Sequence, residues 1–165
     1  MPGFHHIAYA CKDIEETTRF YEALGFPLLY TEVSPHPSGG FLRHIFFEIG
    51  GPGNLAFFDV HGVGEKPDWD SAISTGVGLP VWVNHIAFDA TVERQEEARG
   101  IMDGKGIKPL MEIDHGWCHS LYYTDPNGIM IEFCRDTPGF KANPEEAHEL
   151  LTAVPVGGER LGRKD

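Results

Sequence analysis

Apolar and polar residues alternate with the period of a β-strand in two segments that lie in different halves of the chain, 4–11 and 82–89. Each segment is followed by a pattern typical of an amphipathic helix and then by three further strand-like segments. The predicted helices cover 13–25 and 91–105, and the later strands cover 27–33, 41–49 and 54–60 in the first half and 107–113, 118–124 and 129–135 in the second. The pattern therefore predicts two copies of a strand–helix–three-strand (βαβββ) module.

Turn-forming residues set the expected boundaries of the modules. The segment 61–81 is rich in Gly, Pro and Asp and reads as a linker, with one helical turn expected near 69–73. The predicted modules therefore cover 1–60 and 82–136, within a single structural domain. Residues 137–165 form a C-terminal extension, in which an Asn143 cap and Pro144 predict a short helix to about Thr152.

A histidine opens both modules in the same local sequence. His6-Ile7-Ala8-Tyr9 begins the first, and His85-Ile86-Ala87-Phe88 begins the second, 79 residues later. A late glutamate, Glu132, follows in the last strand of the second module. Two imidazoles and one carboxylate suit a divalent metal with open coordination positions, and small Ala8 and Ala87 leave room on the same strand faces. The alternative is three unrelated polar groups on strands.

A second motif precedes Glu132. Asp114-His115 is followed by Leu121-Tyr122 and then by Asp125-Pro126, Gly128 and Glu132. With the repeated modules, this order resembles the vicinal oxygen chelate superfamily (glyoxalase I, bleomycin- and fosfomycin-resistance proteins and type I extradiol dioxygenases), and it is most similar to the ring-cleaving dioxygenase branch. The resemblance implies an α+β fold in which the two βαβββ modules form an eight-stranded half-barrel around a metal bound by His6, His85 and Glu132.

The resemblance also implies roles for residues near the metal. Tyr122 would donate a hydrogen bond to a metal-bound oxygen or help deprotonate a bound phenol, or else it packs in an aromatic core. His115, rather than the alternative His119, is expected to line the pocket entrance. His5 is either a group that orients substrate or relays a proton, or a half-exposed residue on the opposite strand face. His44 is either an acid–base group or a structural strand histidine.

Two positions depart from the patterns of the related enzymes. The strand at 54–58 carries no carboxylate where glyoxalase I would place its fourth ligand, which disfavours that chemistry. Catechol-cleaving relatives carry a histidine just before this strand, where this chain has Gly53 or Asn54. His44 or His115 would then have to move protons in its place.

We therefore expect a non-haem dioxygenase that uses Fe(II), with Mn(II), Zn(II) or Ni(II) as alternatives, and that takes molecular oxygen and a small aromatic substrate of the phenolic, catecholic or hydroquinone type. The alternative functions are a glyoxalase-type lyase, isomerase or epimerase, and a metal-free drug- or ligand-binding protein of the same fold. Because each module alone exposes one face of its sheet, the two must pack together, and a homodimer is expected.

Composition narrows the partners and the compartment. The 25 acidic and 13 basic residues give a formal net charge of −12, which disfavours nucleic acids and anionic membranes as partners. No apolar segment is long enough to span a bilayer, and no secretory signal opens the sequence. The three cysteines have no CxxC spacing and are expected to be reduced thiols of a cytoplasmic protein.

Overall fold

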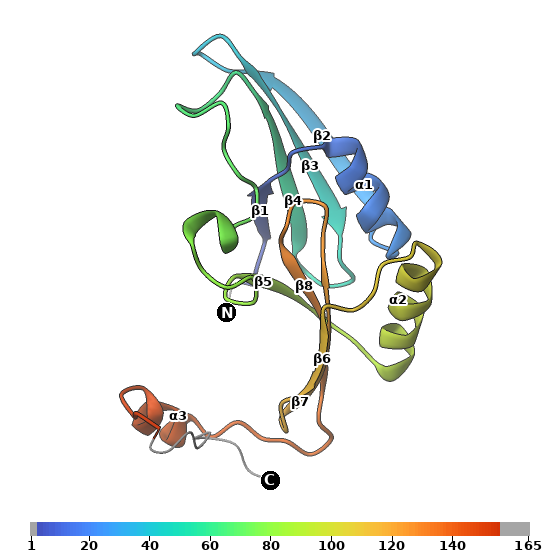
Figure 1. The fold of residues 1–165 in the computed structure, drawn as a ribbon, viewed down its shortest axis with the longest axis vertical. Helices are drawn as coiled ribbons and strands as arrows, with labels where there is room; N and C mark the ends of the chain where they lie inside the picture. Colours follow the sequence, from blue (N-terminus) through green and yellow to red (C-terminus); the bar gives the residue numbers. More distant parts are fainter. Residues whose placement is uncertain (1–2, 156–165) are drawn as a thin grey trace.

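Two copies of one module, each a strand, a helix and three strands, follow one another along the chain (Figure 1). The structure is a computed structural model, and it describes residues 3–155. The first module contains β1 (His6–Ala10), α1 (Ile14–Ala23), β2 (Leu28–Pro35), β3 (Phe41–Glu48) and β4 (Asn54–His61). The second contains β5 (His85–Asp89), α2 (Val92–Gly104), β6 (Met111–Asp114), β7 (Cys118–Thr124) and β8 (Met130–Asp136). The predicted α+β fold with two βαβββ modules is confirmed.

The two modules build sheets of the same strand order. The first sheet runs β1-β4-β3-β2 and the second β5-β8-β7-β6, and in each the first pair is parallel and the other two pairs are antiparallel. The eight strands form two four-stranded sheets, and no strand pairing joins one sheet to the other within the described residues. The first and last strands of a module therefore lie side by side, which brings β5 next to the strand that carries Glu132.

The helices α1 and α2 begin where the sequence predicts them, directly after Asp13 and Thr91. The Asp13 carboxylate accepts a hydrogen bond from the backbone N–H of Glu16, and the Thr91 hydroxyl accepts one from that of Arg94. These bonds satisfy N–H groups that have no partner within the helix. Arg94 also donates from its guanidinium to the backbone carbonyl of Leu24, so the start of α2 is tied to the end of α1.

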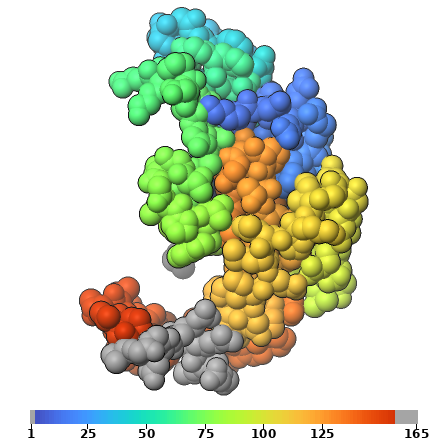
Figure 2. All heavy atoms as spheres, viewed as in Figure 1, coloured from blue at the N-terminus to red at the C-terminus, as the bar shows by residue number. Residues whose placement is uncertain are grey.

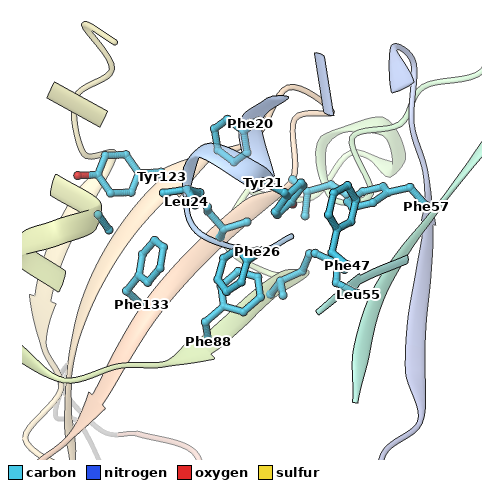
Figure 3. Packing of buried hydrophobic residues seen from close by; sticks show 14 of the residues in the cluster. Phe20, Tyr21, Leu24, Phe26, Phe47, Leu55, Phe57, Phe88, Tyr123 and Phe133 are labelled. Carbon is cyan, nitrogen blue, oxygen red and sulfur yellow. The ribbon is translucent and has the colours of Figure 1, made fainter. Parts of the chain in front are cut away.

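One apolar core is shared by both modules and is formed by residues of both sheets and of α1 and α2 (Figure 3). Phe26, which follows α1, packs against Phe88 of β5 with ring centroids 4.5 Å apart. Tyr21 of α1 is fully buried and contacts Phe47 of β3 and Phe57 of β4. Because aromatic rings of this size carry most of the buried apolar area, this cluster holds the modules together.

The turn between β7 and β8 is tied to the other module by polar bonds. The Tyr21 hydroxyl donates to Asp125 Oδ2 over 2.9 Å, and both residues are buried. The side-chain oxygen of Asn127 accepts a hydrogen bond from the backbone N–H of Lys12. Gly128 takes a φ of +75°, and a Cβ there would lie 2.8 Å from the Cβ of Ala72, so the turn requires glycine.

The linker and the extension differ in part from expectation. The expected helical turn at 69–73 is wrong, because the Asp70 carboxylate accepts a hydrogen bond from the Ala72 N–H and caps a non-helical bend, and a 3₁₀ turn forms instead at Thr75–Val77. The predicted strand at 107–113 starts later, at Met111, since the Ile107 N–H is used to end α2 and Pro109 has no N–H.

The C-terminal helix forms but stands apart from the modules. The Asn143 side chain caps α3 (Pro144–Leu150) as predicted, and none of the residues of α3 is buried. Figure 2 shows α3, in red, separated from the body of the molecule. The remainder of the predicted extension, 156–165, lies outside the described residues. Among the helices of residues 3–155, none combines the length and the apolar character that crossing a membrane requires.

The substitution Tyr21→Phe tests the polar tie between the modules. It removes the hydroxyl that donates to the buried Asp125 carboxylate, so we expect the free energy of unfolding to fall by about 2 kcal/mol. Urea unfolding measures this change. Tyr30→Phe is the matched control, because the Tyr30 side chain is 54% exposed and its loss should cost less than about 0.5 kcal/mol. Equal losses of stability in the two variants would show that the hydrogen bond from Tyr21 to Asp125 does not stabilise the fold.

Candidate metal and substrate site

Side-chain alternation places the predicted ligands on the faces of the two sheets that do not form the core. In β5, Ile86 and Phe88 enter the core, and in β8 Ile131 does the same. His85 and Glu132 alternate with these residues, so they lie on the opposite face. We call this the outer face of each sheet.

His85 and Glu132 meet on the outer face of the second sheet. The register pairs Ala87 of β5 with Glu132 of β8, and His85 Nε2 lies 2.9 Å from Glu132 Oε2. The other ring nitrogen, Nδ1, lies 3.0 Å from the carbonyl oxygen of Trp82. Because a carbonyl only accepts, Nδ1 carries a proton, and in the neutral ring Nε2 then presents a lone pair to the carboxylate.

The Glu132 carboxylate is 5% exposed, so its charge is poorly hydrated. Its second oxygen, Oε1, accepts a hydrogen bond from the Ser120 hydroxyl of β7. The two oxygens thus face different neighbours, Ser120 on one side and His85 on the other. A buried carboxylate needs a hydrogen-bond partner or a positive charge, and here a cation between Oε2 and Nε2 would satisfy both groups.

Tyr122 and His115 form a hydrogen-bonded pair beside Glu132. Tyr122 lies opposite Glu132 in the register, and its hydroxyl is 2.9 Å from His115 Nε2. Burial, as the main cause, raises the pKa of Tyr122 to about 12, and the nearby Glu132 adds to this. The phenol is therefore protonated at neutral pH and serves as a hydrogen-bond donor. His119 alternates with Ser120, so it lies on the other face, within 3.7 Å of Asp114.

The outer face of the first sheet carries a separate histidine group. His6 Nδ1 is 2.7 Å from His5 Nδ1, and the two exposed rings meet edge to face. His44 of β3 lies 6.0 Å from His6 between ring centroids, and Phe46 lies 5.4 Å from it. His5 therefore contacts the predicted ligand directly, and its role in substrate orientation or proton transfer stays a prediction.

His44 is the most unusual member of this group. It is 8% exposed and stacks on Phe58 with ring centroids 3.8 Å apart, while its Nδ1 lies 3.6 Å from Glu32 Oε1. Its other nitrogen, Nε2, is buried and has no hydrogen-bond partner within the described residues. Burial, as the main cause, lowers the pKa of His44, so the ring is neutral with one unpaired nitrogen.

The three predicted ligands do not all converge within one chain. Among residues 3–155, the one group of three histidine, cysteine or acidic side chains whose ligand atoms all lie within 4.8 Å of one another is Cys118, Glu132 and Cys134. Since His85 and Glu132 are in contact, His6 must lie more than 4.8 Å from at least one of them. The chain therefore presents His85 with Glu132 on one outer face and His6 on the other.

A cavity opens at His85. It has a volume of about 420 Å³ and is lined by Tyr9, Ile73, Val83, Asn84 and His85. A larger cavity of about 780 Å³ lies between the β3–β4 turn and the start of α2, and none of the predicted site residues lines it. Only the smaller cavity adjoins a predicted ligand, so it is the candidate for a ligand-binding space.

Sequence reasoning missed several residues of the site. Ser120 contacts Glu132, and the Trp82 carbonyl contacts His85. Glu32 contacts His44. A signal for Ser120 was present, because the Asp125–Gly128 turn sets the β7–β8 register and Ser120 shares a strand face with Tyr122. The contacts of Trp82 and Glu32 depend on loop conformation and side-chain rotamer, which no local sequence pattern indicates.

Comparison with known proteins supports a single family. A model of the Glyoxalase/Bleomycin resistance protein/Dioxygenase superfamily matches residues 3–133. Biphenyl-2,3-diol 1,2-dioxygenase 2 of Rhodococcus globerulus is 36% identical over 61 residues, which are 37% of this chain and 30% of that protein. The putative ring-cleaving dioxygenase MhqA of Bacillus subtilis is 29% identical over 131 residues, which are 76% of this chain and 39% of that protein. The chain thus spans well under half the length of these curated relatives.

A solved structure supports the fold alone. The fosfomycin resistance protein FosX from Listeria monocytogenes, in a complex with Mn(II) and a sulfate ion, superposes with a TM-score of 0.55 at 20% sequence identity. The match covers 84% of this chain and 95% of that one.

The substitution His44→Phe tests the unpaired nitrogen. A buried polar atom without a partner is costly, so we expect Phe to raise the free energy of unfolding by about 1 kcal/mol. Because the folded pKa of His44 is lowered, the unfolded chain binds the proton first as pH falls, and stability is lost below the ordinary value of 6.5.

Urea unfolding at about pH 7.5 and about pH 5.5 checks both expectations, since histidine titrates in this range. The wild-type protein should lose more stability between these two conditions than the Phe variant. His148→Phe, at an exposed position of α3, is the control and should change either value by less than about 0.5 kcal/mol. A His44→Phe protein that is less stable at both pH values would show that Nε2 has a partner.

Proposed function

The chain belongs to the Glyoxalase/Bleomycin resistance protein/Dioxygenase superfamily, and on this basis we propose that it is a divalent-metal-dependent dioxygenase that cleaves the ring of a phenolic, catecholic or hydroquinone-type substrate. Two curated relatives carry dioxygenase names that point to ring cleavage. The residues of the second outer face suit this chemistry, and the steps below rest on them.

The proposal rests on one observation: His85 Nε2 lies 2.9 Å from Glu132 Oε2. The Trp82 carbonyl holds a proton on Nδ1, so Nε2 faces Oε2 either with its own proton, as an ion pair, or with a lone pair that a bound ion would share with the carboxylate. Adjacent donors around an ion at about 2.1 Å lie roughly 3 Å apart, which is the separation found here. Imidazole with carboxylate suits Fe(II), our first choice, and also Mn(II), Zn(II) or Ni(II).

The bound ion would neutralise a phenolate substrate and hold oxygen beside it. The protein supplies the rest. The protonated Tyr122 hydroxyl donates a hydrogen bond toward the open side of Glu132, and His115 Nε2, 2.9 Å from that hydroxyl, exchanges a proton with it. Trp117, whose ring centroid lies 6.1 Å from that of His115, offers a flat apolar wall for an aromatic ring.

The first module lacks a carboxylate at the position equivalent to Glu132. The register pairs Ala87 with Glu132 in the second sheet and Ala8 with Ala56 in the first. Ala56 therefore stands where a second acidic ligand would be placed. A site with one carboxylate favours ring cleavage over a glyoxalase-type isomerisation, for which the fourth ligand was expected.

We propose that the third ligand, His6, comes from a second copy of the chain. One chain carries His85 with Glu132 on one outer face and His6 on the other, and His6 does not lie within 4.8 Å of both partners. In a two-fold dimer, the first sheet of each chain would cover the second sheet of its partner. His44 and His5 would then join Tyr122 and His115 around one ion. Two such sites would form in each dimer.

The compartment that we propose is the cytoplasm. Cys11, Cys118 and Cys134 are all free thiols. A reducing compartment keeps such thiols from forming disulfides and also protects a ferrous ion.

Oxygen consumption tests the activity. Protein loaded anaerobically with Fe(II) should consume oxygen when mixed with catechols or hydroquinones and release a ring-opened product that absorbs visible light. Loss of a ligand in His85→Ala or Glu132→Gln should lower the rate by more than about a hundredfold, since loss of an outer partner alone costs 10–100-fold. His148→Ala, in exposed α3, is the control. Substrate binding without oxygen uptake would indicate a binding protein, and thiol-dependent loss of methylglyoxal would indicate a lyase.

Mixing of variants tests the shared site. His6→Ala and His85→Ala dimers should each bind no Mn(II) at this centre. A mixed dimer contains one site that draws His6 from one chain and His85 with Glu132 from the other, so Mn(II) binding should recover to about one ion per mixed dimer. Electron paramagnetic resonance of free Mn(II) measures this. Binding by the wild type without recovery on mixing would place His6 in the same chain as its partners.

A further inference from the structure

Two thiols lie beside Glu132, on the side away from His85. Cys118 belongs to β7 and Cys134 to β8, and both share the outer face with Ser120 and Glu132. The two sulfur atoms and a Glu132 oxygen all lie within 4.8 Å of one another. Cys118 is fully buried and Cys134 is partly buried, so one side of the group opens toward solvent.

The Ser120 hydroxyl marks the point on which the three donors converge. Its oxygen lies 3.4 Å from Cys118 Sγ and 3.8 Å from Cys134 Sγ, and it donates to Glu132 Oε1. Rotation of this small side chain about its first torsion removes the hydroxyl from the centre of the group. Donors around a tetrahedral ion with bonds of 2.0–2.3 Å lie roughly 3.5–4 Å apart, so small rotations of the thiols bring them to bonding distance.

We propose that Cys118, Cys134 and Glu132 form a second cation site, selective for thiophilic divalent ions. Two thiolates and one carboxylate are the donors that soft or borderline ions such as Zn(II) and Cd(II) prefer, whereas Fe(II) and Mn(II) favour the imidazole and carboxylate at His85. No other cysteine lies in this group, since Cys11 is buried in the core of the described chain.

The second site is coupled to the first through Glu132. Oε1 faces the thiols by way of Ser120, and Oε2 faces His85. Two dications that share one carboxylate repel each other strongly in a poorly hydrated site. A soft ion at the thiols therefore weakens the binding of Mn(II) at His85 by about tenfold or more, and it inhibits the enzyme without touching its imidazoles. This coupling rests on the proposed function, but the thiol site itself does not.

Cadmium titration of the full-length, reduced protein tests the site. We expect one equivalent of Cd(II) to bind with the ultraviolet sulfur-to-cadmium charge-transfer absorption of two thiolates. Cys134→Ser, at the partly exposed position, should remove at least half of this absorption, and Cys118→Ser should do the same. Cys11→Ser is the matched control and should leave the absorption unchanged. Ser120→Ala should tighten Cd(II) binding several-fold, because the hydroxyl no longer competes for Oε1.

The two sites give separate readouts. His85→Ala should lose Mn(II) binding and keep the cadmium–sulfur absorption, while Cys134→Ser should keep Mn(II) binding and lose its sensitivity to Cd(II). The proposal is overturned if the absorption survives in the Cys118→Ser/Cys134→Ser double variant, if Cys11→Ser removes it, or if Cd(II) binds only where His85 is intact and shows no sulfur absorption. Failure of Mn(II) binding in the wild type would count against the proposed function alone.

Discussion

The buried turn between β7 and β8 is the constraint on which the second sheet and its site depend. Asp125 Oδ1 accepts hydrogen bonds from the backbone N–H groups of Asn127 and Ile129, and Oδ2 accepts from the Tyr21 hydroxyl and the Asn127 side chain. Burial raises the pKa of Asp125, and these four donors oppose that shift. One carboxylate therefore closes the hairpin and attaches it to the first module.

The register of the β7–β8 hairpin follows from this turn, and it determines which side chains lie next to one another on the outer face. It sets Tyr122 opposite Glu132 and Ser120 opposite Cys134. A slip of one residue would turn Phe133 outward and bury Glu132 in the apolar core, which is prohibitive for an ionised carboxylate. The same alternation that fills the core thus excludes wrong registers, so the site and the core are specified by one pattern of side chains.

The strand order within each sheet could not be predicted, because alternation does not say which strands pair. The two βαβββ modules and the turns between their strands follow from periodicity, from turn residues and from the repeated histidine. These features depend on the local alternation of side chains and on turn-forming residues, and both can be read from the sequence. The separation of His6 from the His85–Glu132 pair could not be predicted, because alternation assigns a side chain to a face and does not say which two faces meet. The cluster of Cys118, Cys134 and Glu132 was missed for a related reason. Its residues are distant in the sequence and lie together only because β7 pairs with β8.

In the two sites that we propose, the Glu132 carboxylate would allow one small face to discriminate between ions. Its charge is common to both sites, and as a hard oxygen donor it does not by itself favour a thiophilic ion. In the sites that we propose, the imidazole at Oε2, held by the Trp82 carbonyl, would select ions of intermediate hardness, and the thiols near Oε1 would select soft ones. Ser120 lies between these environments and directs Oε1 away from His85. Under this proposal, selectivity would be set by the residues around the shared oxygen pair, and a change at Ser120 would alter the balance without removing a ligand.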